Sequence, residues 1–230
     1  MRSDTGSGVG VVIAAAGRSQ RMGSTDKLKL PLGKGTVLGR VVDTFQNSEV
    51  VDCIVIVLAE YNLEWGRALV LERNCSKVID VCAGGKRRQD SVAAGLARLE
   101  GCSWVIVHDG ARPLVSEDLI LRGIEAAMET GAAVAAIAAV DTIKLAENGY
   151  VYQSLPREKL WVVQTPQIFR FDLLSRAYRE AYDDEVTDDA SLVERLGYPV
   201  KLYEGSHDNI KITTPDDLAI AGVLVKNYDG

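Results

Sequence analysis

The chain alternates short apolar runs with longer segments in which apolar residues recur at helical spacing. The runs are rich in Val and Ile, as buried strands are, and they cover Val9–Ala15, Cys53–Leu58, Lys77–Cys82, Trp104–Val107 and Ala132–Ala138. The segments between them cover Thr36–Phe45, Asn62–Asn74, Gln89–Leu99 and Ser116–Thr130, the last with Ser116 as its N-cap. This alternation predicts an α/β fold, with a mostly parallel, Rossmann-like sheet flanked by helices.

One section, from Val140 to Val163, has no helical period. Two polar strand-like runs flank Glu147-Asn148-Gly149, and Asn-Gly between such runs indicates a hairpin. A hairpin with few apolar residues is not stable alone in water, so it either packs on its own domain or embraces a second subunit. We predict the second arrangement, a protruding β-arm at residues 140–163 that joins a homodimer, because two-fold exchange is the commonest solution.

The remainder of the chain returns to regular elements. Its pattern predicts helices at Arg170–Tyr182 and Asp188–Leu196, a strand at Pro199–Tyr203 and a closing helix at Pro215–Asn227. A chain of 230 residues can bury a sizeable core. We therefore predict a single domain over residues 1–230, with the arm as part of it.

Charge and composition narrow the classes of function. The net charge of −6 argues against a nucleic-acid binder held by bulk charge, so a cationic site has to be local. Met1–Gly8 lacks the apolar region of a signal peptide, and no apolar run approaches the ~20 residues of a membrane span. We therefore expect a cytoplasmic protein with neither nucleic acid nor membrane as a partner. The four cysteines have no metal-ligand spacing and are predicted to be buried free thiols.

Small residues and then cations follow the first predicted strand. Ala14, Ala15, Ala16 and Gly17 allow close approach to the backbone, and the cations after them are Arg18, Arg21, Lys27 and Lys29. Exposed backbone N–H groups beside cations suit a polyphosphate. On this stretch alone, an ordinary strand-to-loop connection remains the alternative.

A second polar cluster, Gly84-Gly85-Lys86-Arg87-Arg88-Gln89-Asp90-Ser91, follows the strand that ends at Cys82. The two glycines permit close backbone approach, and the Ser91 hydroxyl is placed to touch a base or a ribose. The alternative is a tight turn with a solvated, basic helix start. Three consecutive cations at a helix N-terminus oppose the helix dipole, which favours a ligand site.

The third cluster is Val107-His108-Asp109-Gly110-Ala111-Arg112-Pro113, again at the end of a predicted strand. The Asp109 carboxylate is placed to hold a divalent cation that bridges phosphate oxygens, with a turn cap as the alternative. Arg112 is placed to hold a second anion. We interpret His108 as a structural histidine with satisfied hydrogen bonds.

Seven segments in order now carry a family resemblance. They are VVIAAAGRSQRMG followed by DKLKLPL, GGKRRQDSVAAGL, VHDGARP, VDTIK, LPREKLWVVQTPQIF, VTDDASLVE and DNIKITTPDDLAIA. Together they resemble the 2-C-methyl-D-erythritol 4-phosphate cytidylyltransferases of the non-mevalonate isoprenoid pathway, over about Val9 to Ala221. The resemblance implies a nucleotidyltransferase-type fold, a homodimer joined by the arm, and a Mg²⁺-dependent reaction of CTP with methylerythritol phosphate that releases pyrophosphate.

The resemblance also implies roles for individual residues. It assigns catalytic neutralisation of phosphate charge to Arg21, Lys27 and Lys211, with Lys29 competing for the role of Lys27. It assigns nucleotide binding to Ala15, Ala16, Gly17, Gly84, Gly85, Arg88, Ser91 and Gly110. It places Asp109 near the metal and the substrate, and it surrounds the alcohol phosphate with Arg112, Thr142, Arg157 and Thr165, some of them from the partner subunit; Thr187 is a further motif residue.

The chemistry of this reaction fits the residues present. A phosphate monoester has a second pKa of about 6 and is largely dianionic at neutral pH, so its attack needs no strong general base. The site has to align the nucleophile and stabilise the leaving pyrophosphate, which cations and backbone dipoles do. Two alternatives stay open: a ribitol 5-phosphate cytidylyltransferase, and a nucleotide-binding module without catalysis.

Overall fold

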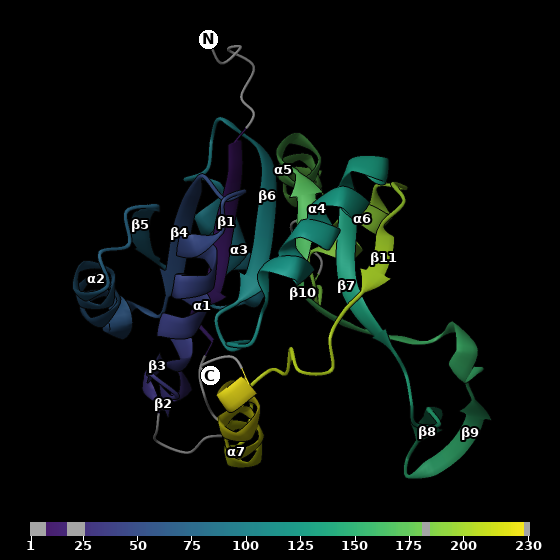
Figure 1. Ribbon diagram of the computed structural model, residues 1–230. Helices are drawn as coiled ribbons and strands as arrows, with labels where there is room; N and C mark the ends of the chain where they lie inside the picture. Colours follow the sequence, from purple (N-terminus) through teal and green to yellow (C-terminus); the bar gives the residue numbers. More distant parts are fainter. Residues whose placement is uncertain (1–7, 18–25, 181–184, 228–230) are drawn as a thin grey trace.

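A computed structural model describes residues 8–17, 26–180 and 185–227, and Figure 1 shows its ribbon. Its main feature is a seven-stranded sheet with the strand order β11-β7-β10-β6-β1-β4-β5. The sheet is parallel except for β10, which runs antiparallel to both of its neighbours. The predicted α/β architecture with a mostly parallel sheet is therefore confirmed.

Strand β1 (Gly8–Ala15) lies inside the sheet, between β4 (Cys53–Leu58) and β6 (Cys102–Asp109), and β5 (Val78–Ala83) forms one edge. The register sets Ala14 opposite both Val57 and Asp109. The carboxyl ends of these strands are therefore level, and the loops that follow them lie together at that end of the sheet. Parallel sheets bind their ligands at the carboxyl ends of their strands.

The other half of the sheet contains a strand that the sequence pattern did not predict. β10 (Trp161–Arg170) lies between β6 and β7 (Ala132–Ala138), and β11 (Lys201–Glu204) forms the second edge. The centre of β10 reads Gln-Thr-Pro-Gln, and a proline within a run argues against a central strand. Its pairing with β7 shifts register between Val163 and Gln167, so β10 pairs with β7 on both sides of this irregular stretch.

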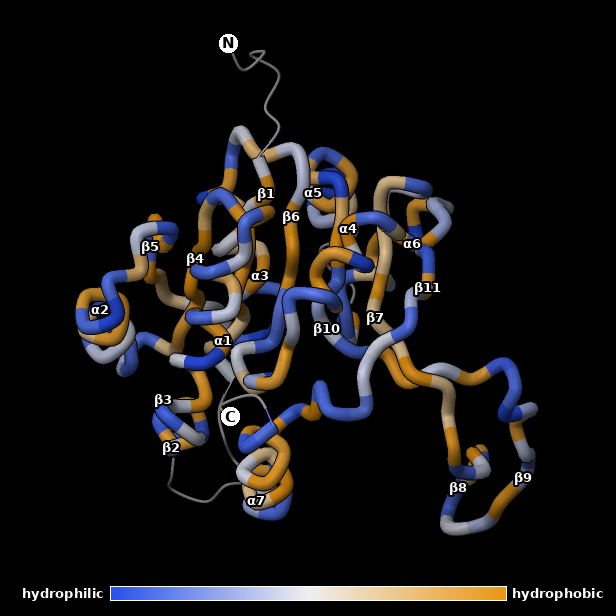
Figure 2. The backbone as a smooth tube through the Cα atoms, viewed as in Figure 1, coloured by the Kyte–Doolittle hydropathy of each residue, from blue (hydrophilic) through white to orange (hydrophobic). Residues whose placement is uncertain are grey.

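Helices cover both faces of the sheet because successive strand residues point to opposite sides. Val11 and Ile13 pack into one core with α1 (Val37–Asn47), α2 (Leu63–Glu72) and α4 (Glu117–Thr130). Val12 packs into the other core with α3 (Arg88–Leu96), α5 (Phe171–Glu180) and α6 (Ala190–Arg195). Figure 2 shows the apolar residues following β1, β4, β6 and β7 through the middle of the molecule. The predicted N-cap Ser116 accepts a hydrogen bond from Leu119 N.

A third, smaller core lies beside the carboxyl ends of the strands. Helix α7 (Pro215–Leu224) and the 3₁₀ turn Val225–Asn227 pack against Leu114 and the short strand β2 (Pro31–Leu32), which pairs with β3 (Gly35–Thr36). Ile212, fully buried in this core, fixes the segment that carries Lys211. A further 3₁₀ turn, Lys27–Lys29, precedes β2.

The predicted hairpin is present as β8 (Lys144–Glu147) and β9 (Tyr150–Ser154), joined at Asn148 and Gly149. Both turn residues have positive φ, +50° and +84°, as an Asn-Gly hairpin turn requires. Figure 1 shows the hairpin standing away from the body of the molecule. The predicted boundary at Val163 is wrong: Trp161, Val162 and Val163 already belong to β10 and pair with β7 in the main sheet.

Two predictions from composition can be compared with the structure. The four cysteines are free, as predicted; Cys75 and Cys82 are buried, whereas Cys53 and Cys102 are only half-buried, with their sulfurs 3.6 Å apart. Across the described ranges, none of the helices has the length and apolar character that crossing a membrane requires.

Candidate active site at the carboxyl ends of the strands

The loops after β1 and β5 contact each other at the carboxyl ends of the strands. A methyl group placed on Gly84 would lie 2.4 Å from Ala16 Cβ and 2.5 Å from Ser91 Oγ, so only glycine fits between them. Gly110 plays a similar part after β6, because its N–H donates to Ala14 O (2.9 Å) and its Cα faces Ala15. The predicted nucleotide-binding loops are thus brought together because glycine at these positions leaves room for the alanines that end β1 and follow it.

Ser91 holds the Gly-Gly loop in shape. The buried hydroxyl accepts a hydrogen bond from Gly85 N (3.2 Å) and donates one to Arg87 O (3.2 Å). The basic helix start is also organised: Arg87 forms an ion pair with Asp90 (2.7 Å), and Arg88 turns toward β6. These pairings offset the cost of placing cations at the N-terminus of α3.

Replacing Gly84 with alanine is expected to destabilise the fold by about 1–3 kcal/mol, because the added methyl overpacks the contact between the two loops. Gly17→Ala is the matched control, since a Cβ there meets no atom of the described residues within 4 Å, and its effect is expected to stay within about 0.5 kcal/mol. Urea unfolding of both variants measures the difference. Equal stabilities for the two variants would show that the loops do not press on Gly84.

Beside these loops lies a cavity of about 380 Å³. Its lining comes from the start of α3, the end of β6 and the loop after it, β10, and the segments before α6 and α7. The predicted site residues in this lining are Arg88, Asp109, Arg112, Thr165, Thr187 and Lys211. All six were singled out from the sequence. The cavity therefore joins predicted site residues that lie more than one hundred positions apart in the chain.

Asp109 is the centre of charge in this cavity. One carboxylate oxygen lies 2.7 Å from Lys211 Nζ and 3.6 Å from Arg112 Nε, and the other lies 3.4 Å from Arg88 Nε. Burial by itself would raise the pKa of Asp109, but the three surrounding cations hold it well below its usual range. The carboxylate therefore stays ionised at neutral pH and orients the cations around it.

The arrangement does not suit Asp109 as a ligand of a divalent cation. Both of its oxygens already face cationic side chains, which would repel a metal ion. Within residues 8–17, 26–180 and 185–227, no three His, Cys, Asp or Glu side chains are grouped as a metal site requires. The residues present thus do not fit the protein-held Mg²⁺ expected at Asp109.

His108 is structural, in agreement with the sequence interpretation. The ring is fully buried, packs edge-to-face against Phe45, and has Nε2 3.1 Å from Arg112 O and Nδ1 3.1 Å from Thr165 Oγ1. A carbonyl only accepts, so Nε2 carries the proton and Thr165 Oγ1 donates to Nδ1. The same Thr165 oxygen accepts from Asp109 N (3.0 Å), so the histidine indirectly fixes Asp109.

Acid is expected to destabilise the protein through His108. Burial lowers the pKa of His108 to about 4, below the ordinary 6.5, so between these values the unfolded chain binds a proton that the folded chain does not. The free energy of unfolding should fall by about 2 kcal/mol from pH 7 to pH 5 through this group alone. Urea titrations of wild type and His108→Gln at both pH values measure this loss of stability. Parallel pH dependences of the free energy of unfolding in the two proteins would contradict the role of His108.

The structure separates the two lysines that competed for one role. Lys27 Nζ donates to Ile212 O (2.9 Å), next to Lys211, whereas Lys29 Nζ lies 5.1 Å from the ring centre of Trp65 on α2. Lys27 is therefore directed toward the segment that lines the cavity, and Lys29 is directed toward α2. This geometry favours Lys27 for a phosphate role.

Some predicted residues lie elsewhere. Thr142 and Arg157 belong to the arm, where both are exposed and Arg157 Nη1 donates to Val140 O (2.7 Å), and neither lines the cavity. Arg21 lies outside the described residues, as does Arg18. The roles of these residues stay predictions.

Sequence reasoning missed three buried polar residues that shape the site: Gln167, Asp189 and Asn209. Gln167 Oε1 accepts from Asp189 N (3.2 Å), Asp189 pairs with Arg88 Nη1 (2.8 Å), and Asn209 Nδ2 donates to Thr165 O (2.8 Å). All three sit within segments that carried the family resemblance. Their partners could not be read from the sequence, because each side chain bonds a residue distant along the chain.

Comparisons with known proteins agree on one family. The model of the 2-C-methyl-D-erythritol 4-phosphate cytidylyltransferase family matches residues 9–227. A protein of that name from Dehalococcoides mccartyi is 50% identical over 219 residues, covering 95% of this chain and 96% of the relative.

Solved structures give the same result. The 4-diphosphocytidyl-2C-methyl-D-erythritol synthase of Anaerococcus prevotii aligns with a TM-score of 0.85 at 29% identity, over 96% of this chain and 99% of that one. The 2-C-methyl-D-erythritol 4-phosphate cytidylyltransferase of Thermus thermophilus aligns with a TM-score of 0.78 at 36% identity, over 94% and 98%. With the family model spanning nearly the whole chain, the protein belongs to the 2-C-methyl-D-erythritol 4-phosphate cytidylyltransferase family.

Proposed function

We propose that this enzyme joins CTP and 2-C-methyl-D-erythritol 4-phosphate to give 4-diphosphocytidyl-2-C-methyl-D-erythritol and pyrophosphate, in the non-mevalonate route to isoprenoid precursors. Membership of the family supports the activity. The observation that carries the proposal is the cavity around Asp109, Arg112 and Lys211, which opens beside the two loops of small residues after β1 and β5. A phosphorylated polyol and a nucleotide triphosphate would then lie side by side.

In the proposed reaction, a phosphate oxygen of the alcohol phosphate attacks the α-phosphorus of CTP. The new O–P bond forms as the bond to the β-phosphate breaks, and the leaving group departs as pyrophosphate. The nucleophile is already largely dianionic, so its attack needs no strong general base, and Arg112 and Lys211 in the cavity lining would supply the cations that this step needs. Lys211 and Arg112 would align the alcohol phosphate, and Lys27 and Arg21 would neutralise charge on the triphosphate.

A divalent cation enters this scheme with the nucleotide. We propose that the substrate is the magnesium complex of CTP, since Asp109 is occupied by Lys211 and Arg88. The Ala15–Gly17 loop and the Gly84–Gly85 loop would contact the nucleotide through their backbone, which small residues permit. Ser91 and Gly110 would hold the shape of these loops through their hydrogen bonds to Gly85 and Ala14, and the reaction would take place in the cytoplasm, where CTP is available.

We also propose that the enzyme is a homodimer joined through the arm. Large apolar residues on and beside the arm are exposed, among them Val140, Tyr150, Val151, Tyr152 and Trp161, and a partner subunit would cover them. Thr142 and Arg157 would then reach the cavity of the partner and contact its alcohol phosphate. This arrangement gives a reason for two functional residues to lie far from the cavity of their own chain.

The choice of alcohol phosphate tests the proposed function. With CTP held constant, kcat/KM is measured for 2-C-methyl-D-erythritol 4-phosphate and for ribitol 5-phosphate. We expect about a hundredfold preference for the methylerythritol compound, which is within the range that pocket contacts supply. A preference for ribitol 5-phosphate would assign the enzyme to the alternative reaction, and binding of CTP without turnover of either compound would indicate a nucleotide-binding module.

A further inference from the structure

A fully buried carboxylate, that of Asp189, lies just before α6 and has no role in the proposed reaction. Asp189 accepts a hydrogen bond from Tyr178 OH (2.5 Å), and its second oxygen lies 2.8 Å from Arg88 Nη1. Its backbone N–H donates to Gln167 Oε1 (3.2 Å). Burying a charge this completely is costly unless it is well paired, so the site is built to hold this carboxylate in one position.

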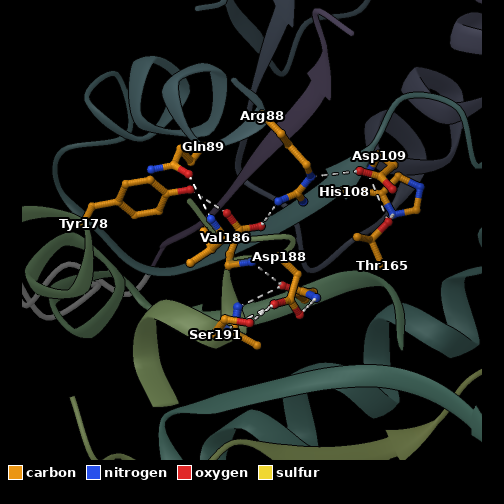
Figure 3. Close-up of polar contacts among 12 residues, drawn as sticks. Arg88, Gln89, His108, Asp109, Thr165, Tyr178, Val186, Asp188 and Ser191 are labelled. Atoms are coloured by element: carbon orange, nitrogen blue, oxygen red, sulfur yellow. Dashed lines mark hydrogen bonds and ion pairs between the residues drawn. The ribbon is translucent and has the colours of Figure 1, made fainter. Parts of the chain in front are cut away.

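Arg88 joins this buried carboxylate to the cavity. Its guanidinium lies between Asp189 (2.8 Å) and Asp109 (3.4 Å). Figure 3 shows the Arg88 side chain directed toward Asp109. Burial opposes the charge on Arg88, but the two carboxylates outweigh it and raise its pKa, so the side chain is always charged. The planar fork of a guanidinium can face two carboxylates at once, which the single ammonium of a lysine cannot do in the same geometry.

The segment before α6 is also attached to α3 by the next residue. Gln89 Oε1 accepts from Val186 N (3.2 Å), so neighbouring residues at the start of α3 hold both ends of the stretch from Val186 to Asp189. That stretch carries Thr187 and Asp188, which line the cavity. The start of α3 directly follows the Gly84–Gly85 loop.

The charges around Asp109 show what Asp189 contributes. Lys211 is the closest cation to Asp109 at 2.7 Å, and Arg88 stands farther off because its shorter ion pair is with Asp189. Without the charge on Asp189, Arg88 would turn fully to Asp109 and compete with Lys211 for it. Asp189 is therefore in direct contact with Arg88, which together with Lys211 faces Asp109.

We infer that Asp189 is a positioning residue: by holding Arg88 away from Asp109, it keeps Lys211 and Asp109 arranged for the alcohol phosphate. The inference rests on the proposed function, because it assigns the alcohol phosphate to this cavity. Asp189 touches no substrate in this arrangement and acts only through Arg88.

The test is a double-mutant cycle with Asp189→Asn and Arg88→Gln. The asparagine keeps the shape of the side chain and an acceptor for Tyr178. We expect Asp189→Asn to lower kcat/KM for methylerythritol phosphate about tenfold or more while KM for CTP stays within about twofold. Because Asp189 acts through Arg88, the double variant should be no worse than Arg88→Gln alone. Asp43→Asn is the matched control, since Asp43 pairs with Arg73 outside the residues that line the cavity, and it should leave both parameters unchanged.

Each result has one meaning. A folded Asp189→Asn variant with kcat/KM within twofold of wild type, or losses that multiply in the double variant, would overturn the inference. Absence of turnover in the wild type would instead contradict the proposed function. If Asp189→Asn does not fold, Tyr178→Phe takes its place, because it removes one hydrogen bond to Asp189 and keeps the charges on Asp189 and Arg88. We then expect KM for methylerythritol phosphate to rise about threefold while KM for CTP stays constant. An unchanged KM for methylerythritol phosphate would overturn the inference.

Discussion

Replacing Lys27 with alanine is expected to lower kcat by about two to three orders of magnitude, because a fixed cation is lost where charge develops on the leaving pyrophosphate. The fold should lose far less than the activity, because the hydrogen bond from Nζ to Ile212 O (2.9 Å) is worth about 1 kcal/mol. Steady-state pyrophosphate release measures the first effect and urea unfolding the second.

Lys29→Ala is the control for Lys27→Ala. It removes the same charge two positions away, from a side chain that lies over Trp65 instead of beside Lys211. We expect its kcat to stay within about threefold of wild type, since it loses a cation–π contact of about 0.5–1 kcal/mol and no contact in the cavity. Unchanged turnover in Lys27→Ala together with a large loss in Lys29→Ala would transfer the role to Lys29.

Arg157→Ala is expected to abolish activity as a homodimer and to regain it in mixed dimers with Lys27→Ala. In the proposed dimer, each cavity combines the body of one subunit with the arm of the other. A mixed dimer then contains one site with both substitutions and one site with neither. A random equimolar mixture, half of it mixed dimers, should show about a quarter of wild-type activity, because one site in two is intact in half of the molecules.

The controls of the mixing experiment decide whether the site is shared. Each variant alone, taken through the same dissociation and reassociation, should remain inactive. The dimer itself is checked by sedimentation at the concentrations used. Activity that does not rise above the sum of the two variants, in a mixture shown to contain mixed dimers, would mean that each subunit is complete without the arm of its partner.

Most of the fold was predictable because its strands and helices follow simple patterns. Runs such as Cys53–Leu58 and Ala132–Ala138 are apolar throughout, and they are strands over those same residues in the structure. β10 escaped prediction for the opposite reason. Gln164, Thr165 and Gln167 are buried in it, and they are polar because they serve the site: Gln164 Nε2 donates to Ser206 O, and Thr165 fixes Asp109.

The candidate site was predictable in its parts more than in its connections. Glycines, cations and Asp109 at the ends of apolar runs indicated where a ligand would bind, and the level strand ends bring them together. Arg88 was assigned to the nucleotide loop, yet its guanidinium reaches two carboxylates on other segments. A long side chain at the start of a helix has many directions open to it, and only the packed structure selects one.

Residues of the arm needed a different kind of information. Thr142 and Arg157 are exposed in one subunit, and no local pattern of charge or periodicity marks them as functional. Only the family resemblance indicates a role for them. Their proposed roles require a dimer in which the arm of one subunit reaches the cavity of the other, and the mixed-dimer experiment tests this arrangement.

The most direct measurement is CTP-dependent pyrophosphate release by the purified protein with 2-C-methyl-D-erythritol 4-phosphate. We predict one pyrophosphate for each molecule of 4-diphosphocytidyl-2-C-methyl-D-erythritol formed, and no release when the alcohol phosphate is omitted, since the site is expected to align the alcohol phosphate, rather than water, with the α-phosphorus. Pyrophosphate release that does not depend on the alcohol phosphate, or no release with it, would contradict the proposed activity.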